Sequence, residues 1–507
     1  MFDSSLAWVT LGGFALTIAI ELLLVPRPAL RRPLSSWLLH AGAWAFALGV
    51  LYLITGRAWF SAINVLAVWL LIVLVSNSKY HSLREPFVCA DFEYFSDAVR
   101  FPRLYLPFFG IGKAIGLAVA FVIYLGCGLY FEPHAAHALA TGSWVLAAGV
   151  LLLGLGHQAS ATPTFQASDD LRRWGLVACL WRYFFAARQA VDIAALGSPF
   201  KAPLASGDNL PDMVSVQSES FFDVRRLYPG VKTGVLSHFD QLRGQALAHG
   251  RLKVAAWGAN TVRTEFAYLS GVAGDRLGVH RFNPYRLLAR QGIPSIAAAL
   301  QQQGYRTICI HPYAGSFYGR DKVLPALGFD QFIDISAFNE SDKAGPFIGD
   351  CAVSAKIIEQ LSAQPRNQPL FIHAITMENH GPLHLEQVSP AELPNWFDSL
   401  PSGPLQDLGP YVRHIANADR MLGQLQCALA NSPRRTSLCF FGDHVPILPD
   451  VYQALGAPDG DTEYFIWSNR QAAATGSQAL PVDRLAATFV ELSQADRAGR
   501  AQQARRA

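Results

Sequence analysis

Residues 436–446 read TSLCFFGDHVP, an apolar run of strand length that ends in two side chains able to hold a metal. A second apolar run, residues 213–216, is followed by Glu219 in the same manner. Short apolar runs of this kind are typical of buried strands, and open α/β sheets carry their chemistry where such strands end. The sequence therefore predicts an α/β domain with a mostly parallel sheet, with Glu219, Asp443 and His444 as metal ligands.

A hydroxyl nucleophile is predicted at Thr261, in the segment GANTVRTEF. Apolar residues recur at helical spacing after it, so Thr261 is expected at a helix start, where backbone N–H groups favour phosphate. A divalent cation between two carboxylates and an imidazole draws a hydroxyl toward alkoxide and neutralises charge on phosphorus. We therefore predict phosphoryl transfer through a phospho-threonine, with Thr261 also a metal ligand. Thr264 is the alternative nucleophile, and Glu219 alone is also compatible with a helix-start carboxylate.

Three segments, in this order, resemble the lipoteichoic acid synthase and phosphoglycerol transferase family of the alkaline phosphatase superfamily. They are Glu219-Ser220-Phe221, residues 261–266, and Gly442-Asp443-His444, with Thr264 where the family usually has Ser. The resemblance covers about residues 211–492. It implies a sulfatase-like catalytic domain that moves glycerol phosphate from phosphatidylglycerol, or a similar phospholipid, to a cell-envelope glycan.

Two further segments extend the resemblance. In HPYAGSFYGRD, residues 311–321, Arg320 and Tyr318 correspond to the arginine and aromatic residue that hold the head group, whereas Gly319 replaces an Asn. An arginine fork suits a phosphodiester because it offers paired donors, and the alternative is a surface ion pair with Asp321 or a neighbour.

The second segment is ITMENHGPL, residues 375–383, which places His380 near the substrate phosphate, as a donor or as the acid for the leaving alcohol. His311 is a weaker substrate-binding candidate, and His373 and His384 are interpreted as structural.

Several functions are disfavoured by what the sequence lacks. It contains no Cys-x-Pro-x-Arg or Ser-x-Pro-x-Arg segment, which sulfate-ester hydrolysis needs, and no nucleotide-binding Gly-rich loop. The net charge of +3 comes without a basic patch interleaved with aromatics, so nucleic acid is not an expected partner. The seven cysteines show no pairing pattern. The oxygen-rich ligand set favours Mn²⁺, with Mg²⁺ or Zn²⁺ as alternatives.

The first third of the chain has the composition of a membrane domain. Five apolar runs approach the roughly 20 residues needed to cross a bilayer, at residues 6–25, 37–54, 58–75, 111–131 and 139–155. We expect a five-helix transmembrane domain over residues 1–160, an interfacial helix capped by Ser168 and a linker over 161–210, a catalytic domain over 211–495, and a disordered tail over 496–507. The loop between spans three and four is either an interfacial platform for a lipid head group, lined by Arg84, Glu85 and Asp91, or a structural loop.

Topology is predicted differently by two criteria. The basic residues after spans one and three place both loops, and so the catalytic domain, in the cytoplasm by the positive-inside rule. The resemblance places the catalytic domain on the periplasmic or extracellular side of a bacterial inner membrane, and we follow it because lipid donor and glycan acceptor meet there. Two alternatives to phosphoglycerol transfer stay open: phosphoethanolamine transfer, and a non-catalytic membrane scaffold.

Overall fold

Two compact units make up the protein, Met1–Val191 and Asp192–Ala507. The computed structural model describes residues 4–92, 111–204, 209–363, 367–400, 405–470 and 476–495. The expected disordered tail and part of the loop after the third apolar run, residues 93–110, therefore lie outside the described residues.

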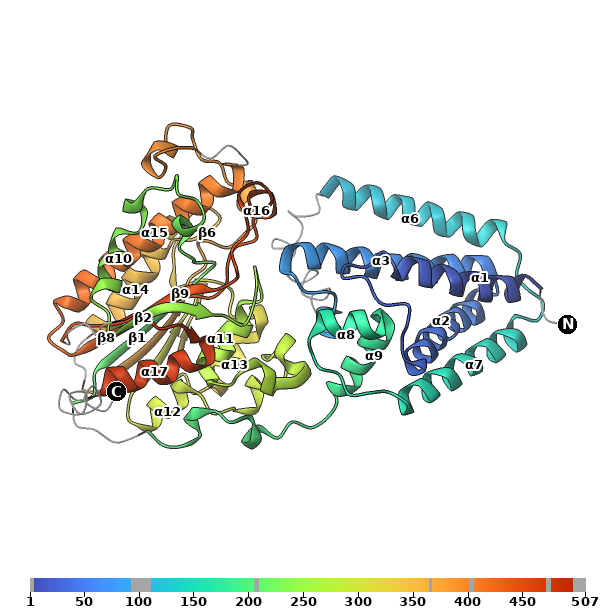
Figure 1. Cartoon of the computed structure of the whole chain (residues 1–507), viewed down its shortest axis with the longest axis horizontal. Helices are drawn as coiled ribbons and strands as arrows, with labels where there is room; N and C mark the ends of the chain where they lie inside the picture. Colours follow the sequence, from blue (N-terminus) through green and yellow to red (C-terminus); the bar gives the residue numbers. More distant parts are fainter. Residues whose placement is uncertain are drawn as a thin grey trace. The chain divides into compact units, whose positions relative to one another are not determined.

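The first unit contains a helix at each of the five predicted apolar runs (Figure 1). These are α1 (Ser4–Glu21), α2 (Leu34–Thr55), α3 (Ala58–Leu83), α6 (Ile111–Phe131) and α7 (Ala138–Gln158). Among the described residues, α2, α3 and α7 are long and apolar enough to cross a membrane, and the described stretches Leu6–Glu21 of α1 and Val119–Phe131 of α6 are shorter apolar helices. Three candidate spans are thus present, and the count of five stays a prediction.

Glycines bring α2 and α7 into close, antiparallel contact. A Cβ at Gly149 of α7 would lie 2.5 Å from the backbone nitrogen of Phe46, and one at Gly42 of α2 would lie 2.8 Å from that of Leu153. Small residues allow helix backbones to approach in this way where lipid removes the hydrophobic drive for helix association. The start of α2 consequently lies beside the end of α7, as the contact of Gly156 with Leu39 also shows.

The predicted interfacial helix is in fact two helices, α8 (Ala167–Trp174) and α9 (Leu176–Ala186), separated by Gly175. Gly175 has a φ of 79°, a conformation that favours glycine and interrupts the helix. The expected cap was wrong, because α8 begins at Ala167 and places Ser168 inside its first turn. Trp174 and Arg182 are buried within this unit.

An eight-stranded sheet forms the centre of the second unit, in the order β10-β2-β9-β8-β1-β7-β3-β4. β1 pairs in parallel with β7 and β8, and β9 runs antiparallel to both of its neighbours. The strands are β1 (Asp212–Ser218), β2 (Ala248–Lys253), β3 (Arg306–Ile310), β4 (Gln331–Ile333), β7 (Leu370–Ile375), β8 (Thr436–Gly442), β9 (Thr462–Ser468) and β10 (Leu480–Pro481). The predicted mostly parallel α/β domain is confirmed.

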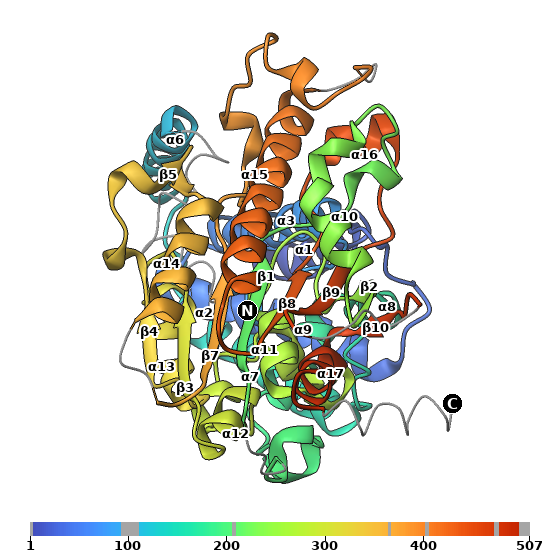
Figure 2. The same cartoon turned by 90° about the vertical axis from the view of Figure 1, so that its left-hand side faces the viewer.

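Helices cover both faces of this sheet (Figure 2). One face carries α10 (Ser237–Gly244), α14 (Asp350–Ser362) and α15 (Leu405–Ala430), and the other carries α11 (Thr261–Ser270), α12 (Ile296–Gln302) and α17 (Val482–Gln494). Successive strand residues point to opposite faces, so Phe440 packs against Phe239 of α10 while Phe441 packs against Tyr268 of α11. Both faces are buried, which explains why β1 and β8 are apolar without strict alternation.

Candidate metal and nucleophile site

Two neighbouring central strands deliver the three predicted metal ligands to one place. Ser218, the last residue of β1, is in register with Gly442, the last residue of β8, so Glu219 and Asp443 leave the sheet at the same level. Glu219, Asp443 and His444 are all buried, and one ligand atom from each lies within 4.8 Å of the others. Among the described residues, these three side chains form the cluster of His, Cys, Asp or Glu residues that could hold a metal ion.

Hydrogen bonds orient these ligands toward a common centre. Asp443 Oδ1 accepts from the backbone N–H of Ser220 at 2.8 Å, whereas Asp443 Oδ2 is buried without a hydrogen-bond partner among the described residues. His444 Nδ1 lies 3.1 Å from the carbonyl of Val445, so that nitrogen donates and Nε2 keeps its lone pair. Nε2 lies 3.5 Å from Glu219 Oε1 and 3.5 Å from Asp443 Oδ2.

The electrostatics of the cluster indicate a site built for a cation. Burial and the neighbouring Glu219 raise the pKa of Asp443 to about 7. Burial lowers the pKa of His444, but the carboxylates of Asp443 and Glu219 outweigh it and raise that pKa overall. Two close buried carboxylates repel each other unless a positive charge lies between them. The orphaned Oδ2 and the free imidazole nitrogen therefore fit a divalent metal.

Thr261 is placed at this cluster, as predicted from the sequence. It is the first residue of α11 and follows Asn260, whose φ is 65°. The Thr261 hydroxyl lies 3.5 Å from Glu219 Oε2 and 3.4 Å from His444 Nε2. Thr261 is half-buried. Its hydroxyl lies at the start of α11, where backbone N–H groups favour an anion.

Thr264, the alternative nucleophile, has a different environment. It is fully buried, and its hydroxyl donates to the carbonyl of Asp443 at 2.8 Å. The same hydroxyl accepts from the backbone N–H of Ala255 at 3.3 Å. Thr264 therefore fastens α11 to the segment that carries the metal ligands.

Arg320 lies in a buried ion pair. It begins α13 (Arg320–Ala326), is 1% exposed, and donates through Nη2 to Glu265 Oε2 at 2.7 Å. Glu265 follows Thr261 by about one turn on α11, and it also accepts from the hydroxyl of Tyr285. The alternative of an ion pair with a neighbour is thus present, but with Glu265 and in the interior of the domain.

His311 joins this group as a neutral imidazole. Its Nδ1 lies 3.2 Å from the carbonyl of Ile375, and its Nε2 lies 3.1 Å from Arg320 Nη1 and accepts from it. Burial and the charge of Arg320 hold the pKa of His311 well below its usual value. Tyr318 lies under the same guanidinium, at 5.3 Å from its ring centre.

His380 is not hydrogen-bonded to the predicted nucleophile, Thr261. It is half-buried, its Nδ1 lies 2.8 Å from the carbonyl of Gly381, and its ring packs edge-on against Phe347 at 5.4 Å. No hydrogen bond links His380 to Thr261 within the described part of the chain. His373 bonds Ser215 in the core at 2.7 Å, and His384 is exposed.

A supporting chain of polar residues was missed from the sequence. Asn379 donates to the carbonyl of Glu219 at 3.3 Å, His414 Nδ1 lies 3.3 Å from Asn379 Oδ1, and His414 Nε2 lies 3.1 Å from Glu386 Oε2. Because the two ends of this chain are 167 positions apart in sequence, no local motif contains it. His414 lies in the amphipathic stretch YVRHIANADR of α15, where nothing local marks it as buried.

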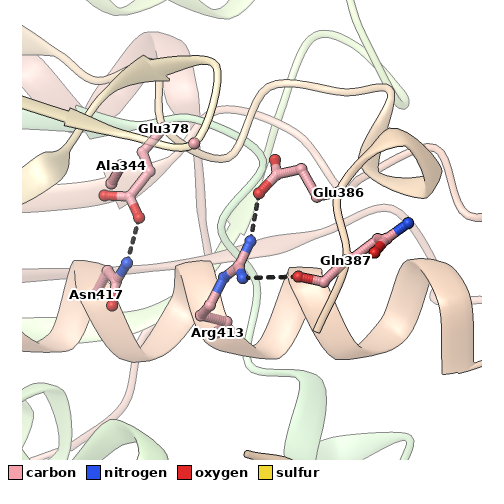
Figure 3. A pocket seen from close by; sticks show the side chains of 7 residues that line it. Ala344, Glu378, Glu386, Gln387, Arg413 and Asn417 are labelled. Atoms are coloured by element: carbon pink, nitrogen blue, oxygen red, sulfur yellow. Dashed lines mark hydrogen bonds and ion pairs between the residues drawn. The ribbon is translucent and has the colours of Figure 1, made fainter. Parts of the chain in front are cut away.

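The hydrogen-bonded series from Glu219 to Glu386 ends at a cavity of about 420 Å³, in the volume range of ligand sites. Figure 3 shows Arg413 between Glu386 and Gln387, and Asn417 pointing to Glu378. The lining residues are Ala344, Gly345, Glu378, Glu386, Gln387, Arg413 and Asn417. Since Glu378 directly precedes Asn379, this cavity adjoins the backbone that supports Glu219.

Comparisons with known proteins identify the family of the second unit. Residues 211–495 match the family described as Sulfatase. The chain is 27% identical over 439 residues, 82% of its length and 78% of the relative, to "Capsular polysaccharide biosynthesis protein RkpI" of Rhizobium meliloti (strain 1021). It is 30% identical over 276 residues to "Putative cyclic beta-1,2-glucan modification protein" of the same organism, covering 51% of this chain and 42% of that protein.

Among solved structures, the chain is similar to Streptococcus pyogenes phosphoglycerol transferase GacH in complex with sn-glycerol-1-phosphate. That similarity has a TM-score of 0.46 at 21% identity and covers 59% of this chain and 78% of the other.

Proposed function

Because the chain belongs to the Sulfatase family, within the alkaline phosphatase superfamily, we propose that it is a membrane-anchored phosphoglycerol transferase acting on a cell-envelope glycan. The observation that carries the proposal is the Thr261 hydroxyl, held within 3.5 Å of two candidate metal ligands at a helix start. The two relatives are named for capsular polysaccharide biosynthesis and glucan modification, which supports a glycan acceptor. The order of the motifs described above supports phosphatidylglycerol as the donor.

The proposed reaction has two half-reactions at one hydroxyl. First, Thr261 Oγ1 forms a bond to the donor phosphorus, the bond to the lipid oxygen breaks, and diacylglycerol leaves. Second, an acceptor hydroxyl attacks the phospho-threonine and restores Thr261. Glu219 Oε2, to which the Thr261 hydroxyl donates at 3.5 Å, is assigned as the acceptor of the Thr261 proton, and His444 Nε2 is left to hold the metal. His380 is assigned as the group that gives a proton to the leaving alcohol.

Glu219, Asp443, His444 and Thr261 would hold a divalent ion, with Mn²⁺ favoured over Mg²⁺ and Zn²⁺ because three of the four ligand groups offer oxygen. When bound, the ion supplies positive charge that stabilises the alkoxide and the charge on phosphorus.

Arg320, Tyr318 and His311 are assigned to the wall that receives the head group. Arg320 is already engaged with Glu265, so it would contribute a fixed donor and a fixed charge rather than a mobile arm. A rigid donor of this type costs no reorganisation when the phosphodiester arrives.

The test is incubation of the purified full chain with phosphatidylglycerol that carries label in its head-group glycerol. We expect labelled glycerol phosphate on the peptide containing Thr261, and later on an added glycan. Thr261→Ala should lower transfer by several orders of magnitude, since a nucleophile that forms a covalent intermediate is lost. Label on Thr264 instead would overturn the assignment of the nucleophile.

Metal dependence is a separate prediction. Wild-type protein should carry one divalent ion per chain by elemental analysis, and Asp443→Asn should lose most of it, because the variant removes a negative ligand. Asp461→Asn, on an exposed loop, is the matched control. Metal-free but fully active wild-type protein would contradict the proposed chemistry.

Phosphoethanolamine transfer is the second candidate function, and one observation favours it. Tyr318 and Gly319 stand where phosphoglycerol transferases are expected to have Trp and Asn, so the head-group wall departs from that pattern. Equal amounts of the two phospholipids offered together decide the question. Preferential transfer from phosphatidylethanolamine would replace the leading proposal.

A further inference from the structure

The first unit contains a buried polar site at the end from which the chain leaves for the catalytic domain. α7 runs antiparallel to α2, so the end of α7, followed by α8 and α9, lies beside the start of α2. Ala178 of α9 packs with Leu39 of α2 and Leu153 of α7 in one cluster. The chain then continues from α9 toward residue 192, where the second unit begins.

Two arginines are buried at this end. Arg182 of α9 is 4% exposed, stacks on the ring of Trp174 at 3.9 Å, and donates through Nη2 to Ser35 Oγ at 3.0 Å. Arg32 precedes α2, donates through Nε to the carbonyl of Ala29 at 2.6 Å, and forms an ion pair with Glu21.

Gly175 lets the two guanidinium groups share one region. A Cβ at Gly175 would lie 2.1 Å from Arg32 Nη1, so any other residue would displace that side chain. Gly175 directly follows Trp174, on whose ring Arg182 stacks. Both arginines therefore border the first turn of α2 and the junction of α8 with α9.

Several donors in this region have no acceptor among the described residues. They are Arg32 Nη2, Arg182 Nε, Arg182 Nη1, Trp174 Nε1 and the hydroxyl of Ser36, all buried. Buried donors without partners are costly, and most of all when they belong to a charged group. Five of them around one helix start indicate a ligand with several acceptor oxygens.

The unpartnered donors of a guanidinium group favour an anion as the ligand. Arg32 is neutralised by Glu21, whereas Arg182 has no ion pair in the described part of the chain. The nearby Asp170 already accepts from Thr164 and from the hydroxyl of Tyr183. Asp170 acts on Arg182 only through its charge and does not bond the unpartnered Nε and Nη1, and a guanidinium group matches phosphate oxygens in geometry as well as in charge.

We propose that this site, formed by Arg32, Ser36, Trp174 and Arg182, binds the phosphate of a membrane phospholipid. A lipid is favoured over free phosphate because Leu30 and Leu34, which flank Arg32 in sequence, are 58% and 73% exposed and offer apolar surface to acyl chains. The site would hold the lipid at the membrane end from which the catalytic domain is tethered. It rests on the proposed function only in that a phospholipid is taken to be the donor.

Native mass spectrometry of the full chain, in the Thr261→Ala background, measures this binding without turnover. We expect retention of phosphatidylglycerol, and a loss of affinity of about tenfold or more in Arg182→Gln, since a charge-assisted hydrogen bond is removed. Trp174→Phe removes the unpartnered indole N–H and leaves a smaller ring for Arg182 to stack on, and it should weaken binding about threefold. Arg188→Gln, an exposed arginine two residues beyond α9, is the matched control and should bind as the parent protein does.

Two comparison ligands separate the sources of phosphate. Diacylglycerol, which lacks phosphate, should not be retained, and inorganic phosphate at millimolar concentration should displace little lipid. Equal retention of phosphatidylglycerol by the parent, Arg182→Gln and Trp174→Phe proteins would overturn the site. Arg182-dependent binding of inorganic phosphate without lipid retention would overturn the lipid assignment. Because binding is read without transfer, neither result depends on whether the proposed reaction occurs.

Discussion

At the residue scale, the two threonines of α11 have separable roles. Thr261 faces the metal ligands, whereas Thr264 bonds the carbonyl of Asp443 from one turn away. We expect Thr264→Ala to lower the free energy of unfolding by about 1–3 kcal/mol, because a buried carbonyl and a buried N–H lose their partner. Thr264→Ser, which keeps the hydroxyl, is the control. Thermal unfolding together with transfer rate should show lost stability with most activity retained, and an activity loss as large as that of Thr261→Ala would contradict this division.

Arg320 gives a second prediction at this scale. Arg320→Ala leaves Glu265 as a buried, uncompensated charge, so we expect a loss of about 3–5 kcal/mol of stability in addition to lost transfer. The double variant Arg320→Met with Glu265→Leu removes both charges and should recover much of the stability but not the activity. Recovery of both would show that the pair is only structural.

The residue scale also shows what the sequence could and could not reveal. Glu219, Asp443 and His444 were predictable because each directly follows an apolar strand. The partner of Arg320 was not, since Glu265 lies 55 positions earlier and is brought to it only by the tertiary fold. Asn379 matched a motif, but its link through His414 to Glu386 depends on where α15 lies on the sheet.

At the element scale, the bounds of β7 can be read from the sequence, because an apolar run interrupted only by His373 lies between Pro369 and Thr376. The direction of β9 was not predictable, since an apolar run looks the same in either orientation. The break at Gly175 was missed because one glycine within a helical pattern is often tolerated. Here a positive φ and the close approach of Arg32 require it.

The seam between α2 and α7 yields a prediction with an internal control. Gly149→Ala places a methyl group 2.5 Å from the backbone nitrogen of Phe46, so the helices must separate. We expect this variant to lose about 1–3 kcal/mol of stability through overpacking. Gly154→Ala, on the same helix with no atom within 4 Å of the new Cβ, should be neutral or slightly stabilising. Thermal unfolding of the full chain in detergent measures both, and equal behaviour would exclude a close α2–α7 contact.

At the scale of the whole molecule, the positive-inside rule and the family resemblance predict opposite sides of the membrane for the catalytic domain. Arg32 is committed to Glu21, and Lys79 at the end of α3 bonds both Glu85 and Asp91 at 2.7 Å. Arg32 and Lys79 therefore have structural partners, and the family resemblance remains the ground for the predicted side of the membrane. Glu85 and Asp91, once candidates for lining a lipid platform, are among those partners.

We accordingly expect the catalytic domain outside the cytoplasm. A phosphatase reporter fused after Ala507 should be active, because that enzyme folds only in an oxidising compartment. A fluorescent reporter that folds only in the cytoplasm, at the same position, should stay dark. The reverse pair of results would place the domain in the cytoplasm and remove access to an external glycan acceptor.

The position of β1 and β8 in the middle of the sheet has a consequence for the lifetime of the site. Every residue of both strands is buried, and each strand is paired on both sides. Segments of this kind open only when the whole domain unfolds, unlike peripheral loops, which open locally. Glu219 and Asp443 are anchored directly to them, so fraying elsewhere leaves the ligand geometry intact. Thr261 is half-buried while Glu219, Asp443 and His444 are buried, so we expect an ion held there to exchange with solvent on the side of Thr261.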